Sequence, residues 1–171
     1  MRMNLLFNIL MMIVCTTSGC VSENEPDGPS LGAGQVLPQF EVAMNNGETV
    51  STSTLKDKVA VIVFFNTDCG DCRQELPVIQ QLWERYEETP DVEVVAISRE
   101  ESETDISTYW EENGLTMPFS PQETREVYSL FASNVIPRIY IANREGIIIA
   151  TYDDSNMPTL QDLTDIIENA L

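Results

Sequence analysis

The sequence contains no histidine and little positive charge, and both absences restrict what the protein can do. Histidine is the side chain that most readily changes its charge near neutral pH, and it is the commonest metal ligand. Only 9 lysines and arginines stand against 28 aspartates and glutamates, which gives a formal charge of −19. Such a surface repels nucleic acid and anionic lipid headgroups, so we expect no nucleic-acid partner.

The N-terminal apolar stretch is too short to remain in a membrane as a spanning helix. It runs from Leu5 to Val14, about ten residues, whereas a spanning helix needs about 20. Arg2 precedes it and the motif TSGC, ending at Cys20, follows it, which is the form of a signal peptide. Small residues before a cysteine resemble the lipobox of bacterial lipoproteins, although Thr17 replaces the usual aliphatic residue. We expect a lipoprotein signal peptide over residues 1–19, with lipid on Cys20. The alternative is a plain secretory leader that leaves this cysteine a free thiol.

The next segment is unsuited to a folded core. Residues 20–34 have few large apolar side chains and many glycines, prolines, serines and acids, so we expect a flexible tether there. Residues 35–171 are then long enough for one domain. The sequence thus predicts a monomer in the bacterial cell envelope, attached to the membrane by its lipid and facing the periplasm or the cell surface.

Cysteine is also scarce, since the chain has four, and only Cys69 and Cys72 are closely spaced. They lie between an apolar strand, Val59 to Phe65, and a segment with helical spacing. A helix N-terminus stabilises a thiolate, and two cysteines at this spacing can close a small disulfide ring. The pair therefore predicts a two-electron redox switch, with an inert structural disulfide as an alternative. Structural zinc needs four N or S ligands, and only Cys15 and Cys20 remain, so we expect no metal.

The remaining residues predict alternating strands and helices. An Asn-Gly turn at Asn46-Gly47 favours a hairpin of Phe40–Met44 with Glu48–Val50, and the unbroken apolar run Val59–Phe65 is typical of a central parallel strand. Further expected elements are a helix over 71–88, a strand over 92–97, a helix over 104–113 ended by Gly114, a helix over 123–131, strands over 139–142 and 147–151, and a helix starting near Pro158. This order predicts an α/β fold with a mixed central sheet, helices on both faces and an N-terminal hairpin.

These features resemble the thioredoxin fold and, more narrowly, the exported, membrane-tethered thiol-disulfide oxidoreductases of the TlpA/ResA type. The resemblance covers residues 35–171. It is carried by the hairpin led by Leu37-Pro38-Gln39-Phe40, by Cys69-Gly70-Asp71-Cys72 with Glu75 and Pro77 downstream, by the helix within 98–114, and by Val135-Ile136-Pro137 before the closing hairpin. It implies dithiol-disulfide exchange without an organic cofactor. Disulfide-containing envelope proteins would be the substrates, and a membrane thiol donor would supply electrons.

The resemblance also implies roles for four residues. Cys69 would be the exposed nucleophile and Cys72 the buried resolving thiol. Pro137 matches the cis-proline that lies opposite the cysteines and offers backbone to a substrate strand. Glu75 corresponds to a glutamate that lies near the thiols and tunes their titration. Taken alone, Glu75 can equally be an exposed first-turn acid that complements the helix dipole.

The chain departs from thioredoxin itself at three positions. Asp68 replaces a tryptophan before the first cysteine, and Val63 replaces a buried aspartate on the preceding strand. Arg138 follows the proline, where the family commonly has threonine. Without the buried aspartate, Glu75 or water is left to accept the proton of Cys72.

The acids around the cysteines favour one redox direction. Asp68, Asp71 and Glu75 place up to three negative charges there, against one nearby cation, Arg73. Like charges disfavour a thiolate, and thiolate stabilisation is what makes strong oxidants oxidising, so the sequence predicts a reductant. Two alternatives stay open: a thiol-based module that binds copper or a client protein, and a peroxiredoxin-like peroxidase. The latter keeps a threonine three residues before its reactive cysteine, where this chain has Asn66.

Overall fold

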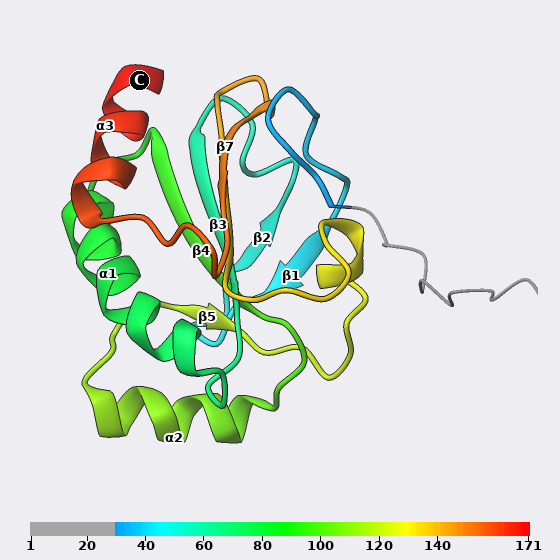
Figure 1. Ribbon diagram of the computed structural model, residues 1–171, viewed down its shortest axis with the longest axis vertical. Coiled ribbons are helices and arrows are strands. Elements are labelled where there is room, and N and C mark those ends of the chain that lie inside the picture. The colour runs from blue at the N-terminus through cyan, green and yellow to red at the C-terminus, as the bar shows by residue number, and fades with distance from the viewer. Residues whose placement is uncertain (1–29) are drawn as a thin grey trace, which may run out of the picture.

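The computed structural model describes residues 30–171. The expected signal peptide, the lipidation site Cys20 and residues 20–29 of the expected tether therefore lie outside the described residues. A five-stranded mixed sheet forms the centre of the described part, in the strand order β5-β4-β3-β6-β7 (Figure 1). Within that part, no helix has the length and apolar content needed to cross a membrane.

Strand β3 (Val59–Phe65) is the middle of the sheet, and all of its residues are buried. It pairs in parallel with β4 (Val92–Ser98) and antiparallel with β6 (Arg138–Ala142). Strand β7 (Ile148–Tyr152) forms one edge of the sheet. An unbroken apolar run is what a strand covered on both faces requires, so the expected central strand is confirmed.

The other edge is β5 (Phe119–Ser120), a strand that the sequence does not reveal. Its two residues pair in parallel with β4, and Pro118 and Pro121 flank them. Two residues are too few to show an alternating pattern, and proline on both sides favours a loop in any reading of the sequence.

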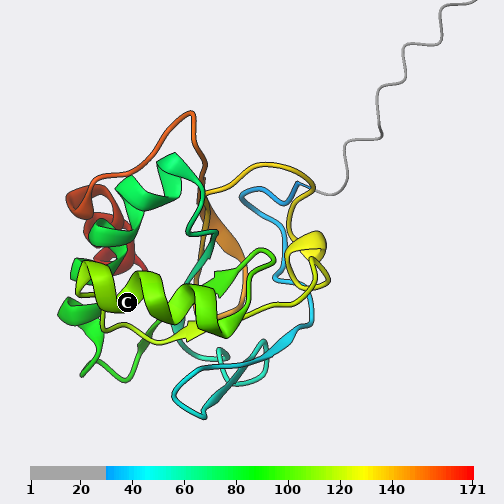
Figure 2. The same cartoon turned by 90° about the horizontal axis from the view of Figure 1, so that it is seen from below.

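Alternate residues of β3 face two different cores, because successive side chains of a strand point to opposite sides. Three helices cover one face: α1 (Gly70–Tyr86), α2 (Glu103–Asn113) and α3 (Leu160–Ala170). Figure 1 shows α1 and α3 side by side with α2 below them, and Figure 2 shows α2 crossing in front of the sheet. The core on this face includes Val61, Val63, Leu76, Ile79, Ile106, Trp110, Leu163 and Ile167.

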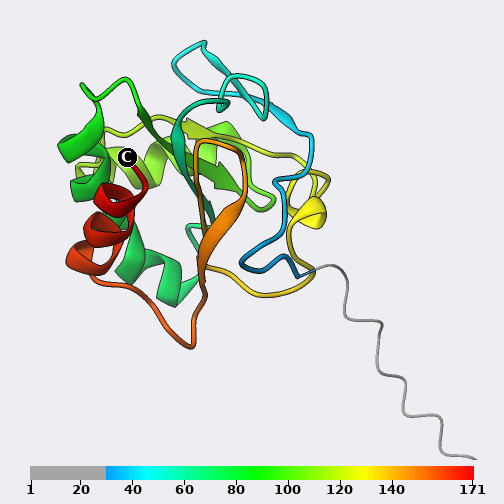
Figure 3. The same ribbon diagram turned by 90° about the horizontal axis from the view of Figure 1, so that it is seen from above.

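The second face is covered by the N-terminal hairpin and a single 3₁₀ turn. The hairpin consists of β1 (Glu41–Ala43) and β2 (Thr49–Ser51), which form a two-stranded sheet of their own. The turn is η1 (Tyr128–Leu130), drawn in yellow opposite α1 and α3 in Figure 3. The predicted hairpin is confirmed, and so is the mixed α/β class. Helical cover of this face, however, amounts to η1 alone.

The helix expected over residues 123–131 is wrong. Only η1 forms there, since Tyr128 and Phe131 are the fully buried residues of the segment, while residues 123–126 are all exposed. Starting a helix is costly, and most helices in proteins are stabilised by packing along one face. A segment that buries side chains over one turn has no packing to support a longer helix.

The N-terminal part of the described chain lies against the domain. The backbone N–H of Leu31 donates to the carbonyl of Phe131 at 2.9 Å, and that of Gly34 donates to Ile148 at 2.8 Å. The guanidinium of Arg138 also donates to the hydroxyl of Ser30 at 3.0 Å. Residues 30–34 are therefore attached to the fold, ahead of the boundary at residue 35 that the composition indicates.

Candidate active site

The two cysteines lie at the junction of β3 and α1. Cys69 is the N-cap of α1, and its sulfur accepts a hydrogen bond from the backbone N–H of Cys72 at 3.3 Å. Orphan N–H groups at a helix start favour negative charge, so the first sulfur lies where a thiolate is stabilised. Both thiols are free. Cys69 is partly exposed and Cys72 is completely buried.

The loop before β6 faces the first cysteine. The thiol of Cys69 lies 3.6 Å from the carbonyl oxygen of Ile136, to which it donates, and the Ile136–Pro137 peptide bond is cis. A surface depression of about 410 Å³ opens here, lined by Asn66, Asp68, Cys69, Arg99, Asn134, Val135, Ile136 and Asp154. The structure thus brings the cysteine turn and the proline loop together, although Cys69 and Ile136 are 67 positions apart in the sequence.

Two buried titratable groups lie on the inner face of α1. Burial raises the pKa of the Cys72 thiol well above its ordinary value, and a hydrogen bond with Cys69 adds to the effect. Glu75 is only 3% exposed, and burial raises the pKa of its carboxyl to about 7. Residues three apart on a helix lie on the same face, so Glu75 shares the buried face of α1 with Cys72. The reading of Glu75 as an exposed first-turn acid is therefore wrong.

Glu75 also carries an unsatisfied polar atom. Its Oε1 atom is buried and has no hydrogen-bond partner among residues 30–171. A buried carboxylate without partners is costly, whereas the protonated acid is tolerated far better. This carboxyl can therefore hold or release a proton near neutral pH, one helical turn below the sulfurs.

The other acids of the motif are in contact with water. The Asp68 side chain is 93% exposed and forms an ion pair of 3.4 Å with Arg73, and Asp71 is exposed as well. Arg73 also donates from Nε to the carbonyl of Thr67 and lies over the ring of Tyr109, 5.7 Å from its centroid. Water and a cation therefore screen the negative charges that the sequence places around the sulfurs.

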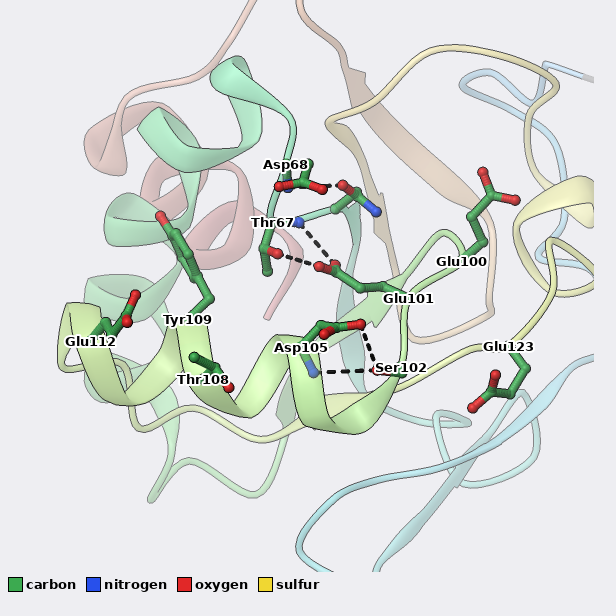
Figure 4. Close-up of a pocket in the computed structure, with 11 residues that line it drawn as sticks. Thr67, Asp68, Glu100, Glu101, Ser102, Asp105, Thr108, Tyr109, Glu112 and Glu123 are labelled. Carbon is green, nitrogen blue, oxygen red and sulfur yellow. Dashed lines mark hydrogen bonds between the residues drawn. The ribbon is translucent and has the colours of Figure 1, made fainter.

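An acidic hollow of about 560 Å³ adjoins the depression and shares Asn66 and Asp68 with it. Figure 4 shows its carboxylates on α2, on the segment after β4, in the cysteine turn and at Glu123. The acidic lining residues are Asp68, Glu100, Glu101, Asp105, Glu112 and Glu123. Glu101 has a structural role, because it accepts hydrogen bonds from the hydroxyl of Thr67 and from its N–H at 2.9 Å. This carboxylate ties the cysteine turn to the end of β4.

Comparisons with known proteins identify the family of this chain. The sequence pattern of the AhpC/TSA family matches residues 33–151. The chain belongs to the AhpC/TSA family. The chain is 28% identical to the thiol-disulfide oxidoreductase ResA of Oceanobacillus iheyensis over 142 residues. The matched region covers 81% of the chain and 73% of ResA.

Two solved structures show the same fold. A thiol:disulfide interchange protein of the thioredoxin family from Chlorobium tepidum gives a TM-score of 0.68 at 21% identity, over 82% of this AhpC/TSA chain and 99% of that one. StoA from Bacillus subtilis gives 0.65 at 21% identity, over 77% and 98% of the two chains. The thioredoxin fold and the resemblance to the ResA type are therefore confirmed, and this AhpC/TSA protein is a thiol-disulfide oxidoreductase.

One charged residue of the site, Arg99, was not predicted from the sequence. Arg99 follows β4 directly, and its backbone N–H donates to the carbonyl of Phe65 at 2.8 Å. Its side chain is 20% exposed and lines the depression with Cys69. Parallel strands end at the same edge of a sheet. The parallel pairing of β3 with β4 therefore places Arg99 beside the cysteine turn.

Proposed function

We propose that the protein reduces disulfides of other proteins outside the cytoplasm, with Cys69 as the nucleophile and Cys72 as the resolving thiol. The observation that carries this proposal is the difference in solvent exposure between the two cysteines. The sulfur of Cys69 is accessible at a helix N-cap, whereas Cys72 is fully buried.

The reaction proceeds by two exchanges. The Cys69 thiolate attacks one sulfur of the client disulfide, a mixed disulfide forms, and the other client sulfur leaves as a thiolate that takes up a proton. The Cys72 thiolate then attacks the Cys69 sulfur, which releases the second client thiol. The client gains two electrons, and the protein keeps a Cys69–Cys72 disulfide that a thiol donor must reduce again.

Glu75 is the residue we assign as proton acceptor for Cys72. Burial raises the thiol's pKa, so resolution of the mixed disulfide needs a base within the protein. The Glu75 carboxyl is buried on the same helical face, and its pKa of about 7 matches a group that exchanges protons at neutral pH. Thioredoxin's aspartate is replaced by the apolar Val63, so Glu75 fills a role that would otherwise fall to water.

The reducing direction follows from the burial of Cys72. A dithiol is a strong oxidant when its reduced form is stabilised as a thiolate, and the desolvated Cys72 gains no such stabilisation. We therefore expect a reduction potential well below about −120 mV, the value of the strongest periplasmic oxidant. A measured potential near that value would refute the reducing direction.

The cell envelope is the compartment we propose, with attachment through lipid on Cys20 and electrons from a membrane thiol donor. The leader-like residues 1–19 support export, and disulfides persist outside the cytoplasm, where such a reductant has substrates. The Cys20→Ala variant should leave the membrane fraction and lose the mass of the lipid. Unchanged fractionation and mass would remove the lipid anchor from the proposal.

A trapping experiment tests the function itself. Cys72→Ser should accumulate mixed disulfides with client proteins in cells, while Cys69→Ala should accumulate none, and only the wild type should reduce insulin disulfides with repeated turnover. The same samples, assayed with peroxide and titrated with copper(I), separate the alternatives. Peroxide consumption without insulin reduction indicates a peroxidase. Tight copper binding that both Cys→Ser variants abolish, again without insulin reduction, indicates a metal-binding module.

A further inference from the structure

The segment after β4 places a cation beside the thiols and an anion behind it. Arg99 lines the depression that contains Cys69, and Glu100 lines the acidic hollow on the other side. The two side chains form an ion pair of 3.5 Å between the Arg99 guanidinium and Glu100 Oε1. This ion pair therefore lies where the depression and the hollow adjoin, with its cation on the side of Cys69.

The charge of Arg99 is only partly neutralised, because Glu100 is shared. Arg125, in the segment before η1, binds the same oxygen of Glu100 through a shorter contact. The hydrogen bond from Arg125 is also the main reason that the pKa of Glu100 lies below its ordinary value. Two guanidinium groups on one carboxylate carry a net positive charge. Arg99 has no other acidic ion-pair partner in the described part of the chain, and its Nε is buried without a hydrogen bond.

The charged groups near the thiols come from four segments. These are Asp68 in the turn, Asp71, Arg73 and Glu75 on α1, Arg99, Glu100 and Glu101 after β4, and Asp154 after β7. Among the cations, Arg73 is half exposed, pairs with Asp68 and points its guanidinium at Tyr109. Arg99 is the cation that lines the depression and is largely shielded from water. Charges that are less solvated act more strongly on a neighbouring titrating group.

We propose that Arg99 is a positioning residue whose charge stabilises the thiolate form of the Cys69–Cys72 pair and so sets the rate of exchange at neutral pH. It acts through space rather than by contact with a substrate. Glu100 and Arg125 adjust the strength of this charge: Glu100 weakens it, and Arg125 restores it by occupying Glu100. The inference rests on the proposed exchange function, and it adds the residue that offsets the acidic surroundings of the site.

Each substitution should shift the pH profile of Cys69 alkylation in a defined direction. The pH profile of iodoacetamide alkylation at Cys69, followed by peptide-resolved mass spectrometry in the full chain, should move to higher pH in Arg99→Gln. A shift of roughly half a pH unit, which is about threefold slower alkylation at pH 7, is expected for a partly screened charge. Arg99→Lys should return the profile towards that of the wild type. Glu100→Gln should move it to lower pH, and Arg125→Gln to higher pH.

Arg85→Gln is the control, because Arg85 also forms an ion pair with a glutamate, Glu168, but lies at the far end of α1 from the cysteines. Its profile should coincide with that of the wild type. Equal shifts in Arg99→Gln and Arg99→Lys would show a structural effect, and a Glu100→Gln shift to higher pH would exclude the electrostatic one. If Arg99→Gln fails to fold, the direction of the pH shift in Glu100→Gln tests the proposal: a shift to lower pH supports it, and no shift or a shift to higher pH refutes it. Insulin reduction by the wild type tests the function separately, so an active wild type with an unmoved profile refutes the role of Arg99 alone.

Discussion

Replacing Glu75 with glutamine should change how the stability of the protein depends on pH. Burial raises the pKa of this carboxyl from an ordinary 4.5 to about 7. Between these two values the folded protein keeps a proton that the unfolded chain has lost. The free energy of unfolding of the wild type therefore falls as the pH rises from about 4.5 to about 7, and it levels off above that.

The size of the effect follows from the two pKa values. Each pH unit of difference corresponds to about 1.4 kcal/mol, so the wild type should lose about 3 kcal/mol between pH 4 and pH 8 through this one group. Glutamine has nearly the same shape and does not titrate. In urea unfolding of the reduced proteins, the stability of Glu75→Gln relative to wild type should rise by that amount over this pH range. Any change in the free energy of unfolding that the amide group causes equally at every pH does not affect the comparison.

Glu111→Gln provides the control, since Glu111 is exposed on α2 and the same charge is removed there without burial. Its stability should follow the wild-type curve at every pH. A difference in unfolding free energy between Glu75→Gln and wild type that is also independent of pH would contradict this prediction. Glu75 would then ionise alike in the folded and unfolded states, and it would be unsuited to accept the proton of Cys72.

Three further substitutions test how the site and its helices are held. Glu101→Gln should lower the free energy of unfolding by about 1–2 kcal/mol, because the charged acceptor for the N–H and hydroxyl of Thr67 is lost, and an unchanged urea midpoint would exclude this anchor. Gly114→Ala should cost about 1 kcal/mol, since the α2 cap has φ 66°, and calorimetry should show a lower Tm. Thr159→Ala should cost about 1 kcal/mol by removing the capping box with Asp162, and equal stability would refute that role.

Elements with a strong local pattern were predictable from the sequence. The apolar run of β3, the hairpin around Gly47 and the end of α2 at Gly114 all form where the pattern places them, and Gly47 and Gly114 have the positive φ that such turns require. The cysteine turn follows from the same local logic, because a strand followed directly by a helix fixes the position of Cys69.

Features that depend on packing between distant segments were not predictable. The sequence cannot show that η1 buries Tyr128 and Phe131 within one turn, or that β5 is added to the edge of β4. Arg99 is a similar case, since the pairing of β3 with β4 brings it beside a cysteine 30 positions earlier in the chain. Arg73 is close to the cysteines in the sequence and is found easily, whereas Arg99 is distant in the sequence and is missed.

We still expect a reductant, but because of the burial of Cys72 rather than because of the acidic residues around the sulfurs. The sequence suggests that acids around the sulfurs disfavour a thiolate, but Asp68 is 93% exposed and Asp71 is exposed too, so water screens both charges. The buried groups act more strongly: burial raises the pKa of Cys72, and Glu75, with a pKa of about 7, is only partly ionised at neutral pH. Desolvation of Cys72, rather than a ring of negative charge, limits how much thiolate stability the dithiol gains. A variant that exposes Cys72 to water should consequently become more oxidising, whereas neutralising Asp68 should leave the reduction potential almost unchanged.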